Sequence, residues 1–403
     1  MPNARRASIF TLVFFLFSLA LALGVGELYV RMRGRYDADG TFYFRDKPIR
    51  PYALPVAQAK RLIDQYNANP TGFMMYDPQL GWTNRPRSCT GDHLYCANAY
   101  GLRSDGDYTA AMRPGTYRVI WTGDSFMFGF NVGLEDSPAR QVERLLKERG
   151  KNAEVLDFAV GGFGFDQAYL RYARDAARFD SSVVVQGLQM ENLTRDVTLF
   201  RIVAFPGTGI PFAKPRFLLR HGALELIDDP TPEPEDVVHT LRNFDKWPLA
   251  RYELYYGSKY QRRWFAPSKL ICTLVDGFIA KKEAADTART ASAMGPHGEA
   301  TNVTVALLER YRDEVTRSGK PFFLVYLPLQ DTITSVMNGQ PDPWQAHLKR
   351  LNGFRIIDPT PRLVAHAKQY GVGSLFNGHY SPAGYRLVAE AVADALAPAI
   401  TRR

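Results

Sequence analysis

A serine that directly follows a predicted buried strand is the first residue whose setting suits chemistry. Ser125 comes after the hydrophobic segment 117–122, within the sequence Thr122-Gly-Asp-Ser-Phe-Met-Phe-Gly, where a strand gives way to a loop and then a helix. A hydroxyl there lies near backbone N–H groups, which suits a nucleophile whose transition state develops an oxyanion. A serine after a strand is usually a turn or cap residue, so Ser125 alone does not indicate catalysis.

Three further residues occupy comparable settings. Gly162 lies in Gly161-Gly-Phe-Gly, just beyond the second predicted strand, where a glycine lets backbone N–H groups approach a ligand closely. Asn192 follows the third predicted strand and can offer a side-chain amide donor. His379 lies in the loop before the closing helix, and a neutral imidazole is the natural base for a serine hydroxyl. Together with the serine, these residues predict a site for acyl transfer.

The elements that must position these residues alternate between strand and helix. Buried strands are predicted at 117–122, 154–160, 182–187, 322–327 and 354–357, and helices at 138–146, 166–177 and from 382 to the C-terminal region. This alternation predicts an α/β fold with a parallel sheet and right-handed crossovers. Open parallel sheets bind ligands at the carboxyl ends of their strands, which is where the candidate residues lie.

The ordered blocks Gly123-Asp-Ser125, Gly162, Asn192 and His379 resemble the SGNH, or GDSL-type, hydrolases over about residues 116–200 and 320–400. The resemblance implies a flavodoxin-like three-layer α/β/α sandwich with a parallel sheet. It implies that Ser125 is the nucleophile and His379 its base, and that the oxyanion hole consists of the Ser125 N–H, the Gly162 N–H and the Asn192 side chain. It implies no cofactor.

Two departures from the family pattern concern the third block and the acid. The third block reads Glu-Asn-Leu where the family commonly has Gly-x-Asn-Asp, and the family's Asp two or three residues before the histidine is replaced by Phe376 and Asn377. An Asn cannot stabilise an imidazolium as a carboxylate does. The site is then a Ser-His dyad oriented by Asn377 or a backbone carbonyl, a triad completed by a displaced Asp358 or Asp331, or a weakened site without catalysis. We favour the dyad.

The N-terminus carries an apolar segment. Arg5 and Arg6 precede an uncharged run from Ala7 to Gly26, long enough to cross a hydrocarbon core of roughly 30 Å. We expect a membrane anchor with the remaining chain outside the cytoplasm, in the periplasm, because no second apolar run of spanning length follows. Ala20-Leu-Ala22 also offers a site for a signal peptidase, and cleavage there would make the protein secreted.

Composition and motifs limit the partners. The 50 Lys and Arg residues exceed the 41 Asp and Glu residues by 9, and this excess is spread along the chain, so we predict no nucleic-acid partner. No zinc, calcium or phosphate-loop motif is present, and we predict no metal. Cys89 and Cys96 bracket a short polar segment and form either a hairpin disulfide or two unrelated thiols, with Cys272 apart from both.

These observations predict three parts: an anchor or signal segment over 1–35, a loop-rich extension over 36–115 packed on the core, and an SGNH-type domain over 116–403 with an insertion at about 200–319. By the resemblance, we expect a serine esterase acting on acyl esters, chiefly acetyl, of cell-envelope polysaccharide. Two alternatives stay open. A sugar hydroxyl as acceptor would make the protein an O-acyltransferase, and the Asn377 block together with the aromatic and basic segment 251–265 would fit an inactive glycan-binding or assembly protein.

Overall fold

The computed structural model describes residues 2–276 and 291–397, which belong to two compact units. Unit 1 comprises residues 1–64, 202–211 and 235–291, and unit 2 comprises residues 65–201, 212–234 and 292–403. The predicted boundaries after residues 35 and 115 both fall inside these units, and the predicted three-part division stays a prediction.

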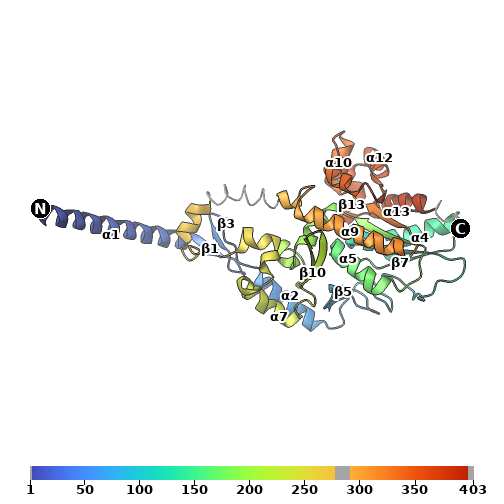
Figure 1. The fold of residues 1–403 in the computed structure, drawn as a ribbon, viewed down its shortest axis with the longest axis horizontal. Coiled ribbons are helices and arrows are strands. Elements are labelled where there is room, and N and C mark those ends of the chain that lie inside the picture. Colours follow the sequence, from blue (N-terminus) through green and yellow to red (C-terminus); the bar gives the residue numbers. More distant parts are fainter. Residues whose placement is uncertain (1, 277–290, 398–403) are drawn as a thin grey trace. The chain divides into compact units, whose positions relative to one another are not determined.

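Unit 2 is built on a five-stranded parallel sheet (Figure 1). Its strands, in chain order, are β6 (Tyr117–Thr122), β7 (Ala153–Asp157), β8 (Val183–Leu188), β11 (Phe322–Tyr326) and β12 (Arg355–Ile357). Their spatial order is β12-β11-β8-β6-β7. Numbered along the chain, this is the flavodoxin-like order 2-1-3-4-5, in which the topological switch point lies between the first and third strands, here β6 and β8.

Helices cover both faces of this sheet. On one face Trp121 of β6 packs in a hydrophobic cluster with Val142 of α4 (Pro138–Glu148) and Val392 of α13 (Pro382–Leu396), joined by α12 (Thr360–Tyr370). On the other face the Thr122 hydroxyl lies 3.0 Å from the Tyr311 hydroxyl of α9 (Glu299–Arg317), and α9 packs beside α5 (Phe165–Arg171). The α/β fold with three layers predicted from the sequence is therefore confirmed, and α9, which lies in the predicted insertion, forms part of one layer.

Shorter elements complete unit 2. Two-stranded antiparallel pairs are formed by β4 (Met74–Asp77) with β5 (Gly81–Asn84), β9 (Arg216–Arg220) with β10 (Ala223–Ile227), and β13 (Phe376–Asn377) with β14 (His379–Tyr380). The short helices are α3 (Ser125–Phe128), α10 (Gln330–Met337) and α11 (Gln345–Leu348), and α6 (Arg201–Ala204) has only its first residue in unit 2. The tight β13–β14 hairpin presents His379 beside the sheet, and Gly378 at its turn has a φ of 74° that favours glycine.

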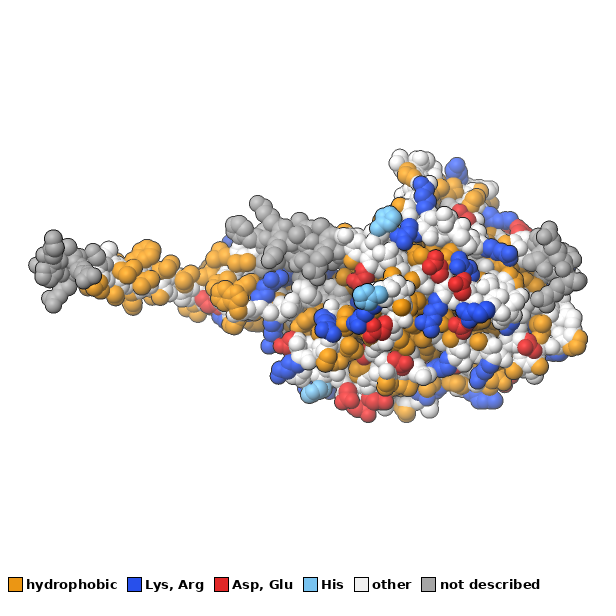
Figure 2. Space-filling view, viewed as in Figure 1, with side chains coloured by type: hydrophobic (Ala, Val, Ile, Leu, Met, Phe, Trp, Pro, Cys, Tyr) orange, Lys and Arg blue, Asp and Glu red, His pale blue; other side chains and the backbone are white. Residues whose placement is uncertain are grey.

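Unit 1 begins with the long helix α1 (Pro2–Arg33), whose segment Ile9–Arg33 is long and apolar enough to cross a membrane. Its side chains are largely exposed, and Figure 2 shows hydrophobic side chains along it. The helix is consistent with a signal or an anchor. The remaining elements are a three-stranded antiparallel sheet of β1 (Gly34–Tyr36), β2 (Phe42–Phe44) and β3 (Lys47–Ile49), and the helices α2 (Val56–Ala68) and α7 (Pro234–Arg242).

The C-terminal end of α1 is part of the folded core of unit 1. Val30 is buried in a cluster with Phe42, Ile49 and Cys272. The Glu27 carboxylate accepts hydrogen bonds from the backbone N–H groups of Lys269 (2.9 Å) and Leu270 (2.7 Å). Because these contacts bind α1 to the rest of unit 1, truncation at residue 35 would remove part of that core.

Candidate active site

The structure brings together the two residues predicted to carry the chemistry. Ser125 is the first residue of α3, directly after β6, and His379 lies 254 residues later on β14. The His379 Nε2 atom lies 2.8 Å from the Ser125 Oγ atom, within hydrogen-bond distance. This is the contact that a general base needs in order to remove the proton of a serine hydroxyl.

Aromatic rings confine the imidazole. The ring of His379 lies 4.6 Å from that of Phe126 and 5.2 Å from that of Phe130, between centroids. Burial lowers the pKa of His379; the nearby Asp124 carboxylate opposes this shift, and the Arg195 guanidinium adds to it. Because burial disfavours the charged imidazolium, the ring is kept neutral and ready to accept a proton near neutral pH.

No acid contacts the other nitrogen of this ring. Among residues 2–276 and 291–397, the buried Nδ1 atom of His379 has no hydrogen-bond partner. The Asn377 side chain is exposed and its backbone carbonyl accepts a hydrogen bond from the Asn131 amide at 2.5 Å, so the predicted orienting contact from Asn377 is absent. Asp358 accepts the Thr360 N–H at 2.8 Å instead, and neither it nor Asp331 bonds to the ring.

Asp124 connects the segment of Ser125 to that of Asn192. It caps α3, where one carboxylate oxygen accepts the Phe126 N–H at 3.0 Å. Its other oxygen accepts the Asn192 Nδ2 at 2.9 Å and pairs with the Arg195 guanidinium at 3.3 Å. A carboxylate must face the NH₂ end of an amide, so this contact decides which way the Asn192 side chain points. The second hydrogen of that NH₂ group can still be donated elsewhere.

The glycine predicted for the oxyanion hole lies in a segment that runs beside β6. The Val160 N–H donates to the Gly123 carbonyl at 3.1 Å, two residues before Ser125. Gly162 has a φ of 85°, a left-handed conformation that favours glycine, and its carbonyl accepts a hydrogen bond from Arg201 at 3.2 Å. Arg195 ties the same segment to Asp124, because it also donates to the Phe163 carbonyl at 2.7 Å. The segments carrying Ser125, Gly162 and Asn192 are therefore linked.

Sequence reasoning assigned no role to Asp124, Arg195 or Arg201. The Asp of the Gly-Asp-Ser block carried a local signal, since an Asp before a helix start is a common cap. The two arginines carried none, because their partners lie 32 to 71 residues away along the chain.

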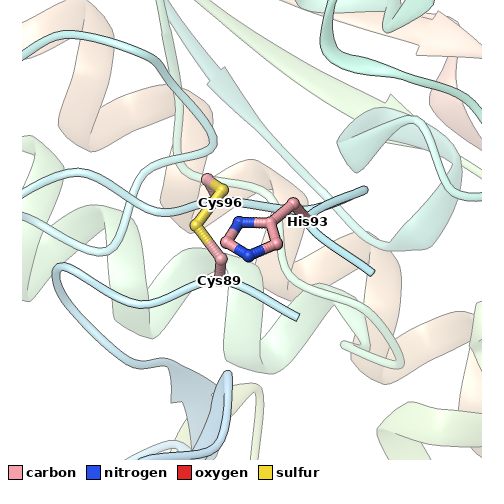
Figure 3. Close-up of side chains that lie close together, drawn as sticks. All are labelled: Cys89, His93 and Cys96. Atoms are coloured by element: carbon pink, nitrogen blue, oxygen red, sulfur yellow. A yellow bond between two sulfur atoms is a disulfide. The ribbon is translucent and has the colours of Figure 1, made fainter. Parts of the chain in front are cut away.

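A second cluster of side chains is formed by two cysteines and a histidine. Cys89 and Cys96 form a disulfide, which decides between the two states left open by the sequence, and His93 lies beside it (Figure 3). The ligand atoms of these three residues lie within 4.8 Å of one another. A thiol must be a free thiolate to bind a metal, so the disulfide form of this cluster does not offer its sulfurs as ligands.

No family model and no curated protein matches this chain. Among solved structures, it is similar to a G-D-S-L family lipolytic protein from Desulfitobacterium hafniense DCB-2, at 12% identity and a TM-score of 0.33, over 70% of this chain and 99% of that one. It is also similar to LAE5, an alpha/beta hydrolase enzyme from the metagenome of Lake Arreo, Spain, at 12% identity and a TM-score of 0.35, over 73% and 98% of the two chains. Both scores are low, so the fold rests on its own strand order and the site on its own geometry.

Proposed function

We propose that this protein is a membrane-anchored SGNH-type serine esterase that removes acyl groups, chiefly acetyl, from cell-envelope polysaccharide. The observation that carries the proposal is the 2.8 Å contact between the Ser125 Oγ and the His379 Nε2 at the carboxyl edge of a parallel sheet. Ligands of such sheets bind at this edge, near the switch point between β6 and β8. Ser125 follows β6 and Asn192 follows β8, on the two sides of that point.

The reaction follows from these residues. Ser125 attacks the ester carbonyl while His379 takes its proton, and the negative charge on the carbonyl oxygen is accepted by the Ser125 N–H, the Gly162 N–H and the free hydrogen of the Asn192 amide. The imidazolium then protonates the leaving sugar oxygen, and water, activated by the same histidine, releases the acid. Phe126 and Phe130 hold the ring in place of an acid. Since replacing the acid in a related triad costs roughly 10⁴-fold, we expect slow turnover.

The substrate class is supported by location. An exposed apolar helix that spans Ile9–Arg33 would hold the protein at a membrane, within reach of polysaccharide of the cell envelope. A sugar hydroxyl in place of water would complete an acyl transfer with the same residues, so an O-acyltransferase is the second candidate. The third candidate is a glycan-binding protein without catalysis, which is favoured because no acid or other partner among the described residues bonds to the Nδ1 atom of His379.

The test compares the wild-type protein with Ser125→Ala in the hydrolysis of an aryl acetate. The full-length chain in detergent is used because Glu27 and Val30 of α1 belong to the core of unit 1. We expect loss of the Ser125 hydroxyl to lower kcat/KM by roughly 10²-fold, because the effects of losing the acid and the serine are not additive and the acid is already missing. Ser318→Ala is the matched control, because Ser318 is exposed at the end of α9 and should leave activity unchanged.

A second measurement separates the candidates. A fluorophosphonate probe should label the wild type, and His379→Ala should abolish that labelling; folded wild-type protein that neither hydrolyses nor reacts would support the binding protein. Incubation with an acetylated polysaccharide, with and without an unacetylated acceptor, then distinguishes the two enzymes. Release of acetate into water indicates the esterase, and acetyl groups appearing on the acceptor indicate the transferase.

A further inference from the structure

One tryptophan outside the predicted machinery holds the segment that carries Gly162. Trp82 lies in β5, within unit 2, and its side chain is 1% exposed. Its indole Nε1 donates a hydrogen bond to the Gly161 carbonyl at 2.9 Å. Its ring packs edge-on against that of Phe163, with the centroids 5.9 Å apart. A buried indole N–H needs an acceptor, and this one uses the peptide group whose other end is the Gly162 N–H.

We propose that Trp82 is a positioning residue of the oxyanion hole, which it sets by fixing the Gly161–Gly162 peptide plane. The inference rests on the proposed function, because it concerns the same site. The cis peptide bonds among the described residues are Arg50–Pro51 and Asp229–Pro230, so this peptide is trans. In a trans peptide the C=O and N–H bonds point in opposite directions. An indole that holds the carbonyl therefore turns the Gly162 N–H away from Trp82.

The other contacts of this segment connect it to the reacting residues. A Cβ atom placed on Gly161 would lie 3.7 Å from the Phe130 ring, and Phe130 packs on His379. Within the described part of the chain, the Gly162 N–H has no hydrogen-bond partner of its own. The N–H is thus held in direction but left available, as a donor for a transient oxyanion must be.

The glycines of this segment need contacts from other residues to fix their backbone conformation. Gly161, Gly162 and Gly164 follow one another closely, and glycine backbones sample many conformations unless contacts restrict them. Trp82 fixes the peptide before Gly162, and the hydrogen bond from Arg201 to the Gly162 carbonyl fixes the peptide after it. A hydrogen bond to the carbonyl also polarises the peptide, which strengthens the N–H at its other end as a donor.

The first test is Trp82→Phe in the full-length protein, which keeps one aromatic ring and removes the indole N–H together with the pyrrole part of the indole. Removing an oxyanion donor outright costs roughly 10²- to 10³-fold in kcat, so an N–H left in place but misdirected should cost roughly 10- to 100-fold. KM should stay within about twofold, because the interaction is made chiefly in the transition state. Unchanged kcat in Trp82→Phe, with an active wild type, would overturn the proposal.

Tyr169→Phe is the matched control. It also removes one hydrogen-bond donor from a buried aromatic side chain of unit 2, here the 2.8 Å bond from the Tyr169 hydroxyl to Glu314. Neither Tyr169 nor Glu314 contacts Ser125 or His379, so we expect kcat and KM of Tyr169→Phe to equal those of the wild type. An equal fall in both variants would mean that loss of a buried hydrogen bond, rather than the direction of the Gly162 N–H, lowers activity.

A second test does not need turnover. Gly161–Gly162 is the one Gly-Gly pair in the sequence, so protein labelled with [1-¹³C, ¹⁵N]glycine has a single ¹³C–¹⁵N peptide bond between glycines and gives one HNCO cross peak. Loss of the indole bond should move the Gly161 carbonyl signal to lower frequency in Trp82→Phe and leave it in place in Tyr169→Phe. A cross peak that does not move in Trp82→Phe would refute the positioning role even if the protein proves to be no esterase.

Phenylboronic acid, whose boron is trigonal and neutral, extends this test to the oxyanion. The Ser125 oxygen donates an electron pair to boron while its proton passes to His379, which gives a tetrahedral adduct with a negative boronate. We expect the Gly162 proton to move downfield on adduct formation in the wild type and to move less in Trp82→Phe. Equal movement in both proteins would show that Trp82 does not direct this N–H. An inactive wild type whose cross peak still responds to Trp82→Phe would reject the proposed function alone.

Discussion

Replacing Arg103 by methionine tests how the end of α3, the helix that begins at Ser125, is held. The Arg103 side chain is 3% exposed and donates hydrogen bonds of 2.6 Å to three carbonyl groups, those of Phe128, Gly129 and Val132. Its guanidinium also lies 4.9 Å from the centre of the Tyr95 ring. These carbonyls lie three, four and seven residues after Ser125, so this one cation fixes the chain from the end of α3 to Val132.

The magnitude follows from what the substitution leaves behind. Hydrogen bonds from a charged group contribute about 1.5–3 kcal/mol each, and three carbonyls would lose their donor. Against this, removing the cation relieves the cost of burying it, the same burial that lowers the pKa of Arg103. We therefore expect Arg103→Met to lower the free energy of unfolding by about 3–5 kcal/mol, as when one partner of a buried charged contact is removed.

The assay is urea unfolding of the full-length protein in detergent, followed by tryptophan fluorescence. Arg103→Lys is the informative control, because it keeps the charge but replaces the planar fork with one ammonium group. We expect this variant to lose about half as much stability as Arg103→Met, since three donors remain on a shorter side chain. A loss below about 1 kcal/mol in Arg103→Met would refute the reasoning, because it is less than one charged hydrogen bond.

Two further predictions concern the pH dependence and the disulfide. Arg195 lowers the pKa of His379, and the base works only when neutral, so Arg195→Met should move the acid limb of the kcat/KM profile to higher pH, whereas Arg195→Lys should leave it in place. An acid limb of the kcat/KM profile that stays at the same pH in Arg195→Met would contradict this prediction. Cys89 and Cys96 are seven residues apart and close a short loop, so reduction should lower the unfolding free energy by about 2.5 kcal/mol, and equal stability with and without reductant would contradict the prediction.

The strands were predictable because each is encoded in adjacent residues. The predicted strand 117–122 coincides with β6, and the predicted helix start at Ser137-Pro138 is the start of α4, where the Ser137 hydroxyl accepts the Arg140 N–H. The predicted strand 154–160 is assigned only to Asp157 in the structure, although the Phe158 and Val160 N–H groups still donate to the Trp121 and Gly123 carbonyls. Between them, the Asp157 carboxylate accepts the Ala159 N–H. That side-chain bond competes with the strand and leaves no periodic signal.

Ser125 and His379 could be proposed as nucleophile and base from the sequence, because each lies in a short block with its own turn and cap residues. Their 2.8 Å contact, across 254 residues, could not, since it depends on the order of strands in the sheet. The same holds for the unpartnered Nδ1 of His379, which no inspection of Phe376 and Asn377 could establish.

Local residue patterns alone thus determined the α/β class, the apolar N-terminal helix and the candidate nucleophile and base, because capping, periodicity and turn chemistry act over a few adjacent residues. Tertiary structure alone decided what surrounds them. The Asp124 carboxylate faces Asn192 from 68 residues away, and the Trp82 indole reaches Gly161 from 79 residues away. Such contacts form only when folding brings segments that are distant in the sequence together, and the sequence carries no local signal for them.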